Sequence, residues 1–201
     1  EFTLDGVRAV AAESCRRLRR VGVETVATIA HGIEVGEVDA RGAGQAVAEG
    51  SILGLYRFDK YKSSDEDKSE VAELRVGEID ASKSADLQAG VDEGVVVAES
   101  VNFCRDMANE PANVMTPTRM SELALEVSRE AGLELEVIDR PQMAVLGMGA
   151  LLGVAQGSEE PPKLIVLRYH GDPDNEKNHL GLLGKGITFD SGGPDIKSAA
   201  G

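Results

Sequence analysis

The chain has 201 residues, of which 42% are hydrophobic, and a formal net charge of −14. This length and apolar content are enough to build a folded core, so a disordered chain is excluded. The excess of 35 acidic over 21 basic residues would repel phosphate backbones, and no basic patch interleaved with aromatic residues occurs, so nucleic acid is excluded as a partner.

Cysteine usage and the lack of long apolar runs bear on the cellular compartment. Cys15 and Cys104 lie far apart in segments with a helical pattern, whereas a secreted scaffold of this size normally carries several disulfides. We therefore expect two reduced core thiols in a cytoplasmic protein. No run approaches the roughly 20 apolar residues of a spanning helix, so no membrane partner is expected. Because no initiator methionine precedes Glu1, we expect the true start to lie upstream.

The first part of the chain alternates helical and strand patterns. Apolar residues recur at helical spacing from Asp5, a candidate N-cap, and arginines crowd the end of this first helix, where cations suit the helix dipole. Residues 21–30 are rich in β-branched side chains and predict a buried strand, residues 40–55 predict a helix, and residues 71–79 predict a second strand. The polar run at residues 63–70 predicts a solvated loop.

A long helix follows, and then a second alternation of elements. Residues 82–108 carry one apolar stripe and predict a helix that ends before Asn109 and could connect two domains. The N-cap Thr116 and the first-turn Pro117 predict another helix, which Gly132 closes. Further predicted elements are strands at residues 133–138, 150–155, 163–169 and 180–187, a short helix at 141–146, and a hairpin-like turn within 170–179.

The fold class follows from these strands. Those after Gly132 are nearly continuous apolar runs separated by helices, which is typical of a mostly parallel sheet covered on both faces. We therefore predict an α/β protein with a second, mostly parallel sheet beyond the long helix.

The candidate chemistry is concentrated in residues 185–201, a glycine-rich stretch that holds Lys185, Asp190 and Lys197. Lys185 follows a predicted buried strand, and ligands bind at the carboxyl ends of such strands. Its amine could bind a metal or act as a base, or it could extend into solvent. Asp190 could bridge divalent cations or be an ordinary turn aspartate, and Lys197 could polarise a carbonyl or be a surface lysine. These groups are too few to hold a metal pair.

Other motifs are weaker. Gly184-Lys185 is similar to the end of a Walker sequence, but Gly186 replaces the required Ser or Thr and His179 replaces a required glycine, so a phosphate loop is excluded. Residues 147–152 imitate a dinucleotide fingerprint, with its third glycine displaced. The histidines lack the spacing of a zinc site and are interpreted as structural or solvent-facing: His31, His170 and His179.

Four segments form long motifs in a fixed order. They are residues 48–62, which contain Tyr56-Arg57-Phe58-Asp59; Asn109-Glu110-Pro111-Ala112-Asn113 with Thr116-Pro117; residues 147–158; and Gly184-Lys185-Gly186-Ile187-Thr188-Phe189-Asp190-Ser191-Gly192-Gly193. Together they resemble the leucyl (cytosol) aminopeptidase family, and the resemblance covers nearly the whole chain.

The resemblance implies a domain organisation and an activity. It implies an incomplete macro-like N-terminal domain at residues 1–82, a linking helix at 83–110, and the truncated start of a mostly parallel-sheet catalytic domain at 111–201. The implied activity is that of a metallo-exopeptidase that releases N-terminal residues, leucine-like ones preferred, from peptides. Two divalent metal ions, Mn or Zn with Mg or Co as alternatives, would activate water. Homohexamers are the usual assembly of this family.

The motif also implies roles for individual residues. Lys185 matches the amine ligand of one metal, Asp190 the carboxylate that bridges both metals, and Lys197 the catalytic lysine that polarises the scissile carbonyl and stabilises the tetrahedral gem-diolate. Pro194 stands where relatives commonly carry an aliphatic residue. The remaining metal ligands and the bicarbonate-binding arginine belong to motifs beyond Gly201, so this chain alone is expected to be inactive.

Two classes of function remain open at this point. The first is a truncated metallo-aminopeptidase. The second is a non-catalytic module that binds small molecules or partners through its macro-like half.

Overall fold

The computed structural model describes residues 2–63, 69–175 and 177–189. The chain divides into two compact units, Glu1–Asn109 and Glu110–Gly201, and each is described by itself. The long helix is counted with the first unit, whereas the domain boundaries at residues 82 and 110 stay predictions. Part of the predicted loop at 63–70 lies outside the described residues.

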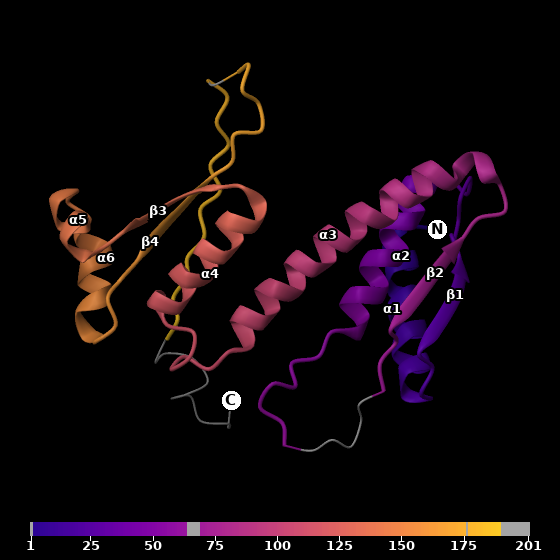
Figure 1. Cartoon of the computed structure of the whole chain (residues 1–201), viewed down its shortest axis with the longest axis horizontal. Coiled ribbons are helices and arrows are strands. Elements are labelled where there is room, and N and C mark those ends of the chain that lie inside the picture. The colour runs from indigo at the N-terminus through magenta and orange to yellow at the C-terminus, as the bar shows by residue number, and fades with distance from the viewer. Residues whose placement is uncertain (1, 64–68, 176, 190–201) are drawn as a thin grey trace. The chain divides into compact units, whose positions relative to one another are not determined.

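The N-terminal unit consists of three α-helices, one short 3-10 helix and two strands in its described residues (Figure 1). They agree closely with the predicted elements: α1 (Leu4–Arg20), β1 (Thr25–Ile29), α2 (Ala40–Leu55), β2 (Glu73–Gly77), the 3-10 helix η1 (Ala81–Lys83) and α3 (Ser84–Asn109). The predicted cap of α1 is wrong, because the Thr3 side chain, not that of Asp5, accepts the Gly6 N–H at 3.1 Å. Asp5 lies in the first turn, where a carboxylate suits the helix dipole.

The two strands of this unit form a parallel pair with helices on one face. The register runs from Thr25 opposite Glu73 to Ile29 opposite Gly77. Leu74 and Val76 of β2 pack against a buried cluster from the helices: Val7, Ala46 and Val47. The prediction of a fully buried first strand is wrong, because alternate residues of both strands are exposed, as expected of a sheet covered on one side.

Glycines let the three helices approach closely. A Cβ atom at Gly50 of α2 would lie 2.3 Å from the carbonyl oxygen of Arg8 in α1, and one at Gly90 of α3 would lie 1.9 Å from the carbonyl oxygen of Arg41 in α2. Both distances are far below van der Waals contact, so only glycine fits these helix crossings. Helix α2 is therefore enclosed, and its buried face includes Ala43, which is fully inaccessible.

Both cysteines are free, but they occupy different environments. Cys15 is buried with 2% exposure, as predicted, whereas Cys104 is exposed. The prediction for Cys104 is wrong because the buried stripe of α3 passes through Leu87, Gly94 and Ala98. Cys104 lies six residues beyond Ala98, about 240° around the helix, and therefore on another face.

The second unit contains short helices and one strand pair in its described part. Its elements are α4 (Pro117–Ala131), β3 (Glu134–Ile138), α5 (Arg140–Val145), α6 (Gly149–Val154), the 3-10 helix η2 (Ala155–Gly157) and β4 (Leu164–Arg168). Thr116 caps α4 and Gly132 closes it in the left-handed conformation, both as predicted. The predicted strand at 150–155 is wrong, because the Ala-Leu-Leu run after Gly149 consists of strong helix formers.

Strands β3 and β4 run antiparallel, with Glu134 opposite Arg168 and Ile138 opposite Leu164. The parallel pair in the described residues is β1 with β2, in the first unit, and the chain is a mixed α/β fold. The β3–β4 pair of the second unit is antiparallel, whereas mostly parallel strands were expected there. An apolar run indicates burial of a strand. It carries no information on strand direction, which the connection determines.

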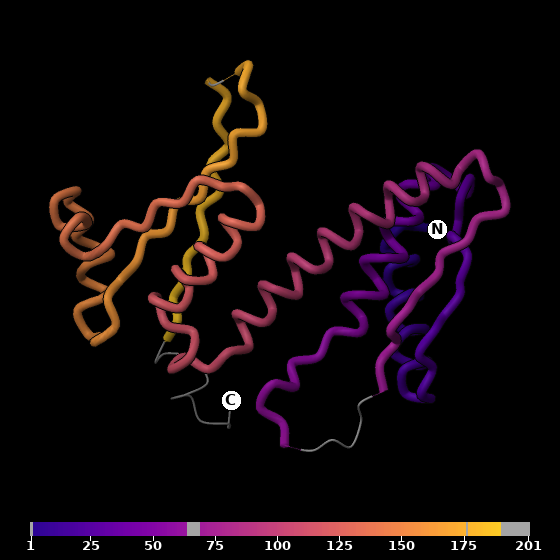
Figure 2. The backbone as a smooth tube through the Cα atoms, in the orientation of Figure 1, coloured from indigo at the N-terminus to yellow at the C-terminus, as the bar shows by residue number. Residues whose placement is uncertain are grey.

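The predicted strand at 180–187 does not form in the described residues. Its leucines are solvent-exposed, Leu183 by 99%, and none of the described strands pairs with this segment. A strand requires ladder hydrogen bonds from a neighbour, so the apolar pattern alone does not produce one. The segment runs along α4 (Figure 2), where a Cβ atom at Gly186 would lie 3.2 Å from the sulfur of Met120.

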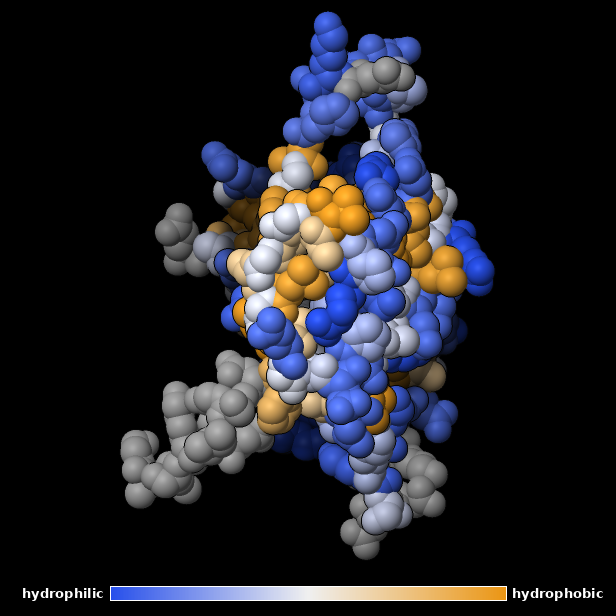
Figure 3. Space-filling view, turned by 90° about the vertical axis from the view of Figure 1, so that its left-hand side faces the viewer, coloured by the Kyte–Doolittle hydropathy of each residue, from blue (hydrophilic) through white to orange (hydrophobic). Residues whose placement is uncertain are grey.

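Apolar side chains remain at the surface of the second unit. The view from the side of α5 and α6 shows apolar atoms between hydrophilic ones (Figure 3). Val145, Val154 and Tyr169 are each at least 75% exposed, whereas Met143 is fully buried. In the parts of the chain that the structure describes, no helix combines the length and apolarity needed to cross a membrane.

Candidate functional site

The structure describes one of the three predicted site residues. Lys185 is exposed in the extended segment beside α4, and its amine has no hydrogen-bond or ion-pair partner among the described residues. Asp190 and Lys197 lie outside the described residues. Whether the three side chains converge is therefore not tested, and their roles stay predictions.

The donor chemistry of this stretch is compatible with a divalent metal. The accessible amine of Lys185 supplies a nitrogen donor, and Asp190, five residues later, supplies carboxylate oxygens. Such mixed N/O donor sets suit Zn²⁺ and Mn²⁺. Within residues 2–63, 69–175 and 177–189 no group of three His, Cys, Asp or Glu residues could hold a metal ion.

The motif around Pro111 organises the start of α4, the helix beside Lys185. The carbonyl oxygen of Pro111 accepts the N–H groups of Val114 and Met115 at 2.8 and 2.9 Å. The Thr116 hydroxyl then accepts the N–H of Arg119 at 3.2 Å and caps the helix. This motif therefore has a local structural role: it turns the chain sharply into α4.

Two of the family-like motifs meet within the N-terminal unit. The Tyr56 hydroxyl, just after α2, donates to the Asp106 carboxylate at 2.8 Å and accepts from the Asn109 amide at 3.1 Å. The Arg105 guanidinium lies 5.3 Å from the Tyr56 ring centroid. The sequence analysis missed this cluster because its partners are about 50 residues apart and show no common period. The sequence signal that could have indicated the contact was that Tyr56 and Asn109 each belong to a family-like motif.

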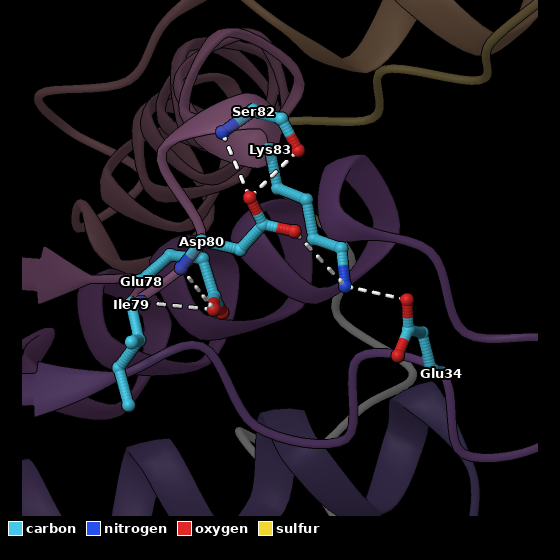
Figure 4. Close-up of polar contacts among 6 residues, drawn as sticks. All are labelled: Glu34, Glu78, Ile79, Asp80, Ser82 and Lys83. Carbon is cyan, nitrogen blue, oxygen red and sulfur yellow. Dashed lines mark hydrogen bonds and ion pairs between the residues drawn. The ribbon is translucent and has the colours of Figure 1, made fainter.

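A second polar cluster surrounds the carboxyl end of β2 (Figure 4). The Glu78 carboxylate accepts the backbone N–H groups of Ile79 and Asp80, and the Lys83 amine donates to Glu34 at 2.6 Å. The hydrogen bond to Glu34 raises the pKa of Lys83. The Asp80 carboxylate accepts the hydroxyl and backbone N–H of Ser82, and the hydroxyl is the main reason that the pKa of Asp80 is lowered.

A cavity of about 340 Å³ adjoins this cluster between β2 and α3. Its walls combine apolar side chains with hydrogen-bonding groups: Val76, Gly77, Glu78, Ser84, Leu87, Gln88 and Val91. The carboxyl ends of parallel strands are common ligand positions in α/β proteins. The cavity is thus a candidate small-molecule site in the N-terminal unit, separate from Lys185.

Comparison with known proteins identifies the family. The model of the cytosol aminopeptidase family N-terminal domain matches residues 1–65, and that of the catalytic domain of the same family matches residues 102–201. A probable cytosol aminopeptidase of Alkaliphilus metalliredigens is 43% identical over 202 residues, which is 100% of this chain and 40% of the relative. The chain therefore belongs to the cytosol aminopeptidase family, and it spans about two fifths of the length of the curated relatives it matches.

Solved structures agree with this assignment. The bottromycin maturation enzyme BotP in complex with Mn is similar with a TM-score of 0.71 and 32% identity, over 83% of this chain and 33% of that one. A mutant of tomato leucine aminopeptidase has a TM-score of 0.69 at 21% identity, over 80% of this chain and 32% of that one, and supports the fold alone.

Proposed function

We propose that the whole protein is a metal-dependent aminopeptidase that releases N-terminal residues, leucine-like ones preferred, from peptides. The observation that carries this proposal is the match of both family domains in the order of the cytosol aminopeptidases, with Lys185 and Asp190 inside the catalytic-domain match. The names of the relatives support the activity, and the manganese complex of BotP supports dependence on a divalent metal.

In this proposal the metal residues act through their donor atoms. Lys185 would hold one of two divalent ions, Mn or Zn with Mg or Co as alternatives, through its amine nitrogen, and Asp190 would hold both ions through its carboxylate oxygens. Bound metals of this kind make water a nucleophile at neutral pH and polarise carbonyls. Lys197 is proposed to donate a hydrogen bond to the scissile carbonyl oxygen as negative charge develops there.

The exposure of Lys185 fits this role in one respect. Its amine is directed to no described carboxylate, so metal binding would not have to break an existing ion pair. Residues 1–201 alone are proposed to be inactive.

The decisive test is Lys185→Ala in the complete protein, with Lys177→Ala as the matched control. Both lysines are exposed, but Lys177 lies outside the motif. We expect Lys185→Ala to lower metal-dependent release of leucine from leucinamide by at least about a thousandfold, because the metal that stabilises the transition state is lost. Metal content per protein, measured by mass spectrometry, should fall by about one ion. Wild-type turnover and wild-type metal content in Lys185→Ala would refute the assignment.

Location and assembly are proposed from the family. The relatives are named for the cytosol, so the whole protein is proposed to act in the cytoplasm. A homohexamer is proposed as its assembly, which sedimentation of the complete protein would test.

A non-catalytic binding module is the second candidate, and the cavity beside β2 favours it. The carboxylate of Glu78 and the side-chain oxygens of Ser84 and Gln88 are able to accept hydrogen bonds from a ligand, while Val76, Leu87 and Val91 offer an apolar wall. Such a cavity suits a small amine with an aliphatic body. If the complete protein releases no leucine with any divalent metal, whereas the 201-residue chain binds isoamylamine by calorimetry, this candidate replaces the peptidase.

A further inference from the structure

Helix α3 leads to the junction between the two units, and its last turn is hydrogen-bonded to the segment after α2. Helix α3 ends at Asn109, which is also the last residue of the N-terminal unit. The last carbonyl groups of a helix have no partner inside it, so this turn frays unless other groups hold it. Here the side chains of the last turn reach across to the segment that follows α2.

Tyr56 is the centre of these contacts. Its hydroxyl donates to Asp106 at 2.8 Å and accepts from Asn109 at 3.1 Å, so both hydrogen-bonding functions of the phenol are used by one helical turn. The two partners are three residues apart and therefore lie on the same side of α3. A phenylalanine at this position could make neither contact.

Arg105 contacts both the aromatic ring of Tyr56 and the backbone of α2. Its guanidinium lies 5.3 Å from the ring centroid of Tyr56 and donates to the carbonyl oxygen of Leu53 at 3.2 Å. That carbonyl belongs to the last turn of α2, where backbone acceptors are otherwise unpaired. Arg105 thus joins the ends of both helices, and Tyr56 is held between them.

The titration of Tyr56 agrees with this geometry. Desolvation by the surrounding groups is the main cause that raises the pKa of the phenol, and the hydrogen bond to Asp106 raises it further. The Asn109 amide acts in the opposite direction. The neutral phenol is therefore the form that the cluster stabilises.

We propose that Tyr56 is a positioning residue, which fixes the last turn of α3 and thereby the point at which the chain leaves the N-terminal unit at Glu110. The physical link between the motif at Tyr56 and the motif that begins at Asn109 is this hydrogen-bonded turn. Its role goes beyond the proposed peptidase chemistry, since it concerns the local order of the last turn of the N-terminal unit.

Hydrogen exchange of the 201-residue chain tests the proposal without any peptidase activity. In Tyr56→Phe we expect the amides of residues 105–109 to exchange about tenfold faster, because local opening no longer breaks two hydrogen bonds. The amides of α1 and of the first half of α3 should keep their rates. Tyr169→Phe, which removes a hydroxyl from an exposed ring of the other unit, is the matched control and should change nothing at residues 105–109.

Two further measurements decide the mechanism. Asp106→Ala should accelerate the same amides, and the double variant should not exceed the effect of Tyr56→Phe alone, because Tyr56→Phe already breaks the hydrogen bond that Asp106→Ala removes. In a background of Tyr61→Phe and Tyr169→Phe, which leaves one tyrosine of three, Asp106→Ala should lower the pH at which the phenol ionises in ultraviolet absorbance. Unchanged exchange at residues 105–109, equal acceleration over all of α3, or an unchanged phenol titration would each overturn the proposal.

Discussion

The two units hold their apolar side chains in different ways. In the N-terminal unit Ala43, Ala46 and Val47 are at most 1% exposed, because three helices and a strand pair close over them. In the described part of the second unit Met143 is fully buried, whereas Leu182 and Leu183 are almost fully exposed. The first unit contains the partners of its own elements. The second contains an apolar segment whose strand partners are not among the described residues.

This difference teaches that similar local patterns have unequal outcomes. Residues 71–79 and 180–187 both read as apolar strands, yet only the former contains a strand, β2, which pairs with β1. Burial of a strand depends on a neighbour that supplies hydrogen bonds and a layer that covers its side chains. Substitutions that remove a packing contact should therefore cost more in the N-terminal unit.

The largest effect is expected at the crossing of α2 and α3. Gly90→Val would place a Cβ atom 1.9 Å from a backbone oxygen of α2, and backbone cannot move aside without separating the helices. We expect a loss of about 3 kcal/mol or more in the free energy of unfolding. Urea denaturation followed by circular dichroism measures it.

Gly153→Ala is the control from the other unit. Gly153 lies inside α6, and a Cβ atom there would meet nothing within 4 Å. Alanine is the better helix former, so we expect stability to rise by about 0.5 to 1 kcal/mol. If both variants unfold at the wild-type urea concentration, the contrast between the units is wrong.

A smaller loss is expected from Met143, the large side chain that is fully buried in the described part of the second unit. Met143→Ala should lower the free energy of unfolding by about 2 to 3 kcal/mol, because it leaves a cavity where a fully buried side chain was packed. Hydrogen exchange should localise the change to peptides after Glu110. Val47→Ala, at 1% exposure, should change exchange only before Asn109. Acceleration in both units from either variant would show that they unfold together.

Charged pairs give the third test. Arg8 donates through Nε to Glu49 at 2.5 Å, and the Glu49 side chain is only 7% exposed. Arg8→Met keeps the aliphatic stem but leaves this carboxylate with the hydrogen bond from the Gln45 amide, so we expect a loss of about 2 kcal/mol. Arg168→Met removes exposed pairs with Glu134 and Glu136 and should not change stability measurably. Equal losses in thermal melts would contradict this ranking.

The sequence predicted most elements of the fold and few contacts of the site. Residues 40–55 and Thr116 to Gly132 were placed correctly because helical period and capping residues are local signals. The strand at 150–155 was wrong because apolar content does not distinguish a short helix from a strand. Apolar content also carries no information on strand direction, so the antiparallel pairing of β3 with β4 was not foreseen. The Tyr56 cluster was missed because long-range hydrogen bonds leave no period in the sequence. The metal roles of Lys185 and Asp190 and the catalytic role of Lys197 depend on the family motif and stay predictions.

The smallest effect concerns two carboxyl groups, one in each unit. The hydrogen bond from His170 is the main cause that lowers the pKa of Glu134, with Arg168 adding to it, whereas the neutral Ser82 hydroxyl is the main cause that lowers the pKa of Asp80. A lowered carboxyl pKa stabilises the fold above the ordinary value of the group, and this contribution disappears as the pH falls through the lower folded value. Both contributions should therefore be present at pH 7 and absent in strong acid.

Salt should separate the two carboxyl groups, because ions screen charges but not a hydrogen bond from a neutral hydroxyl. We expect about 1 M sodium chloride to move the pKa of Glu134 toward its ordinary value and to leave that of Asp80 nearly unchanged, as measured by carboxyl carbon shifts in NMR titrations. His170→Ala should have the same direction of effect on Glu134, and Ser82→Ala should raise the pKa of Asp80 in low salt. If salt raises the pKa of both carboxyl groups equally, charge rather than the Ser82 hydroxyl is the main cause of the lowered pKa of Asp80. The charge responsible would then be that of Lys83, whose amine lies 3.9 Å from the Asp80 carboxylate, and the local order at the start of α3 would depend on it.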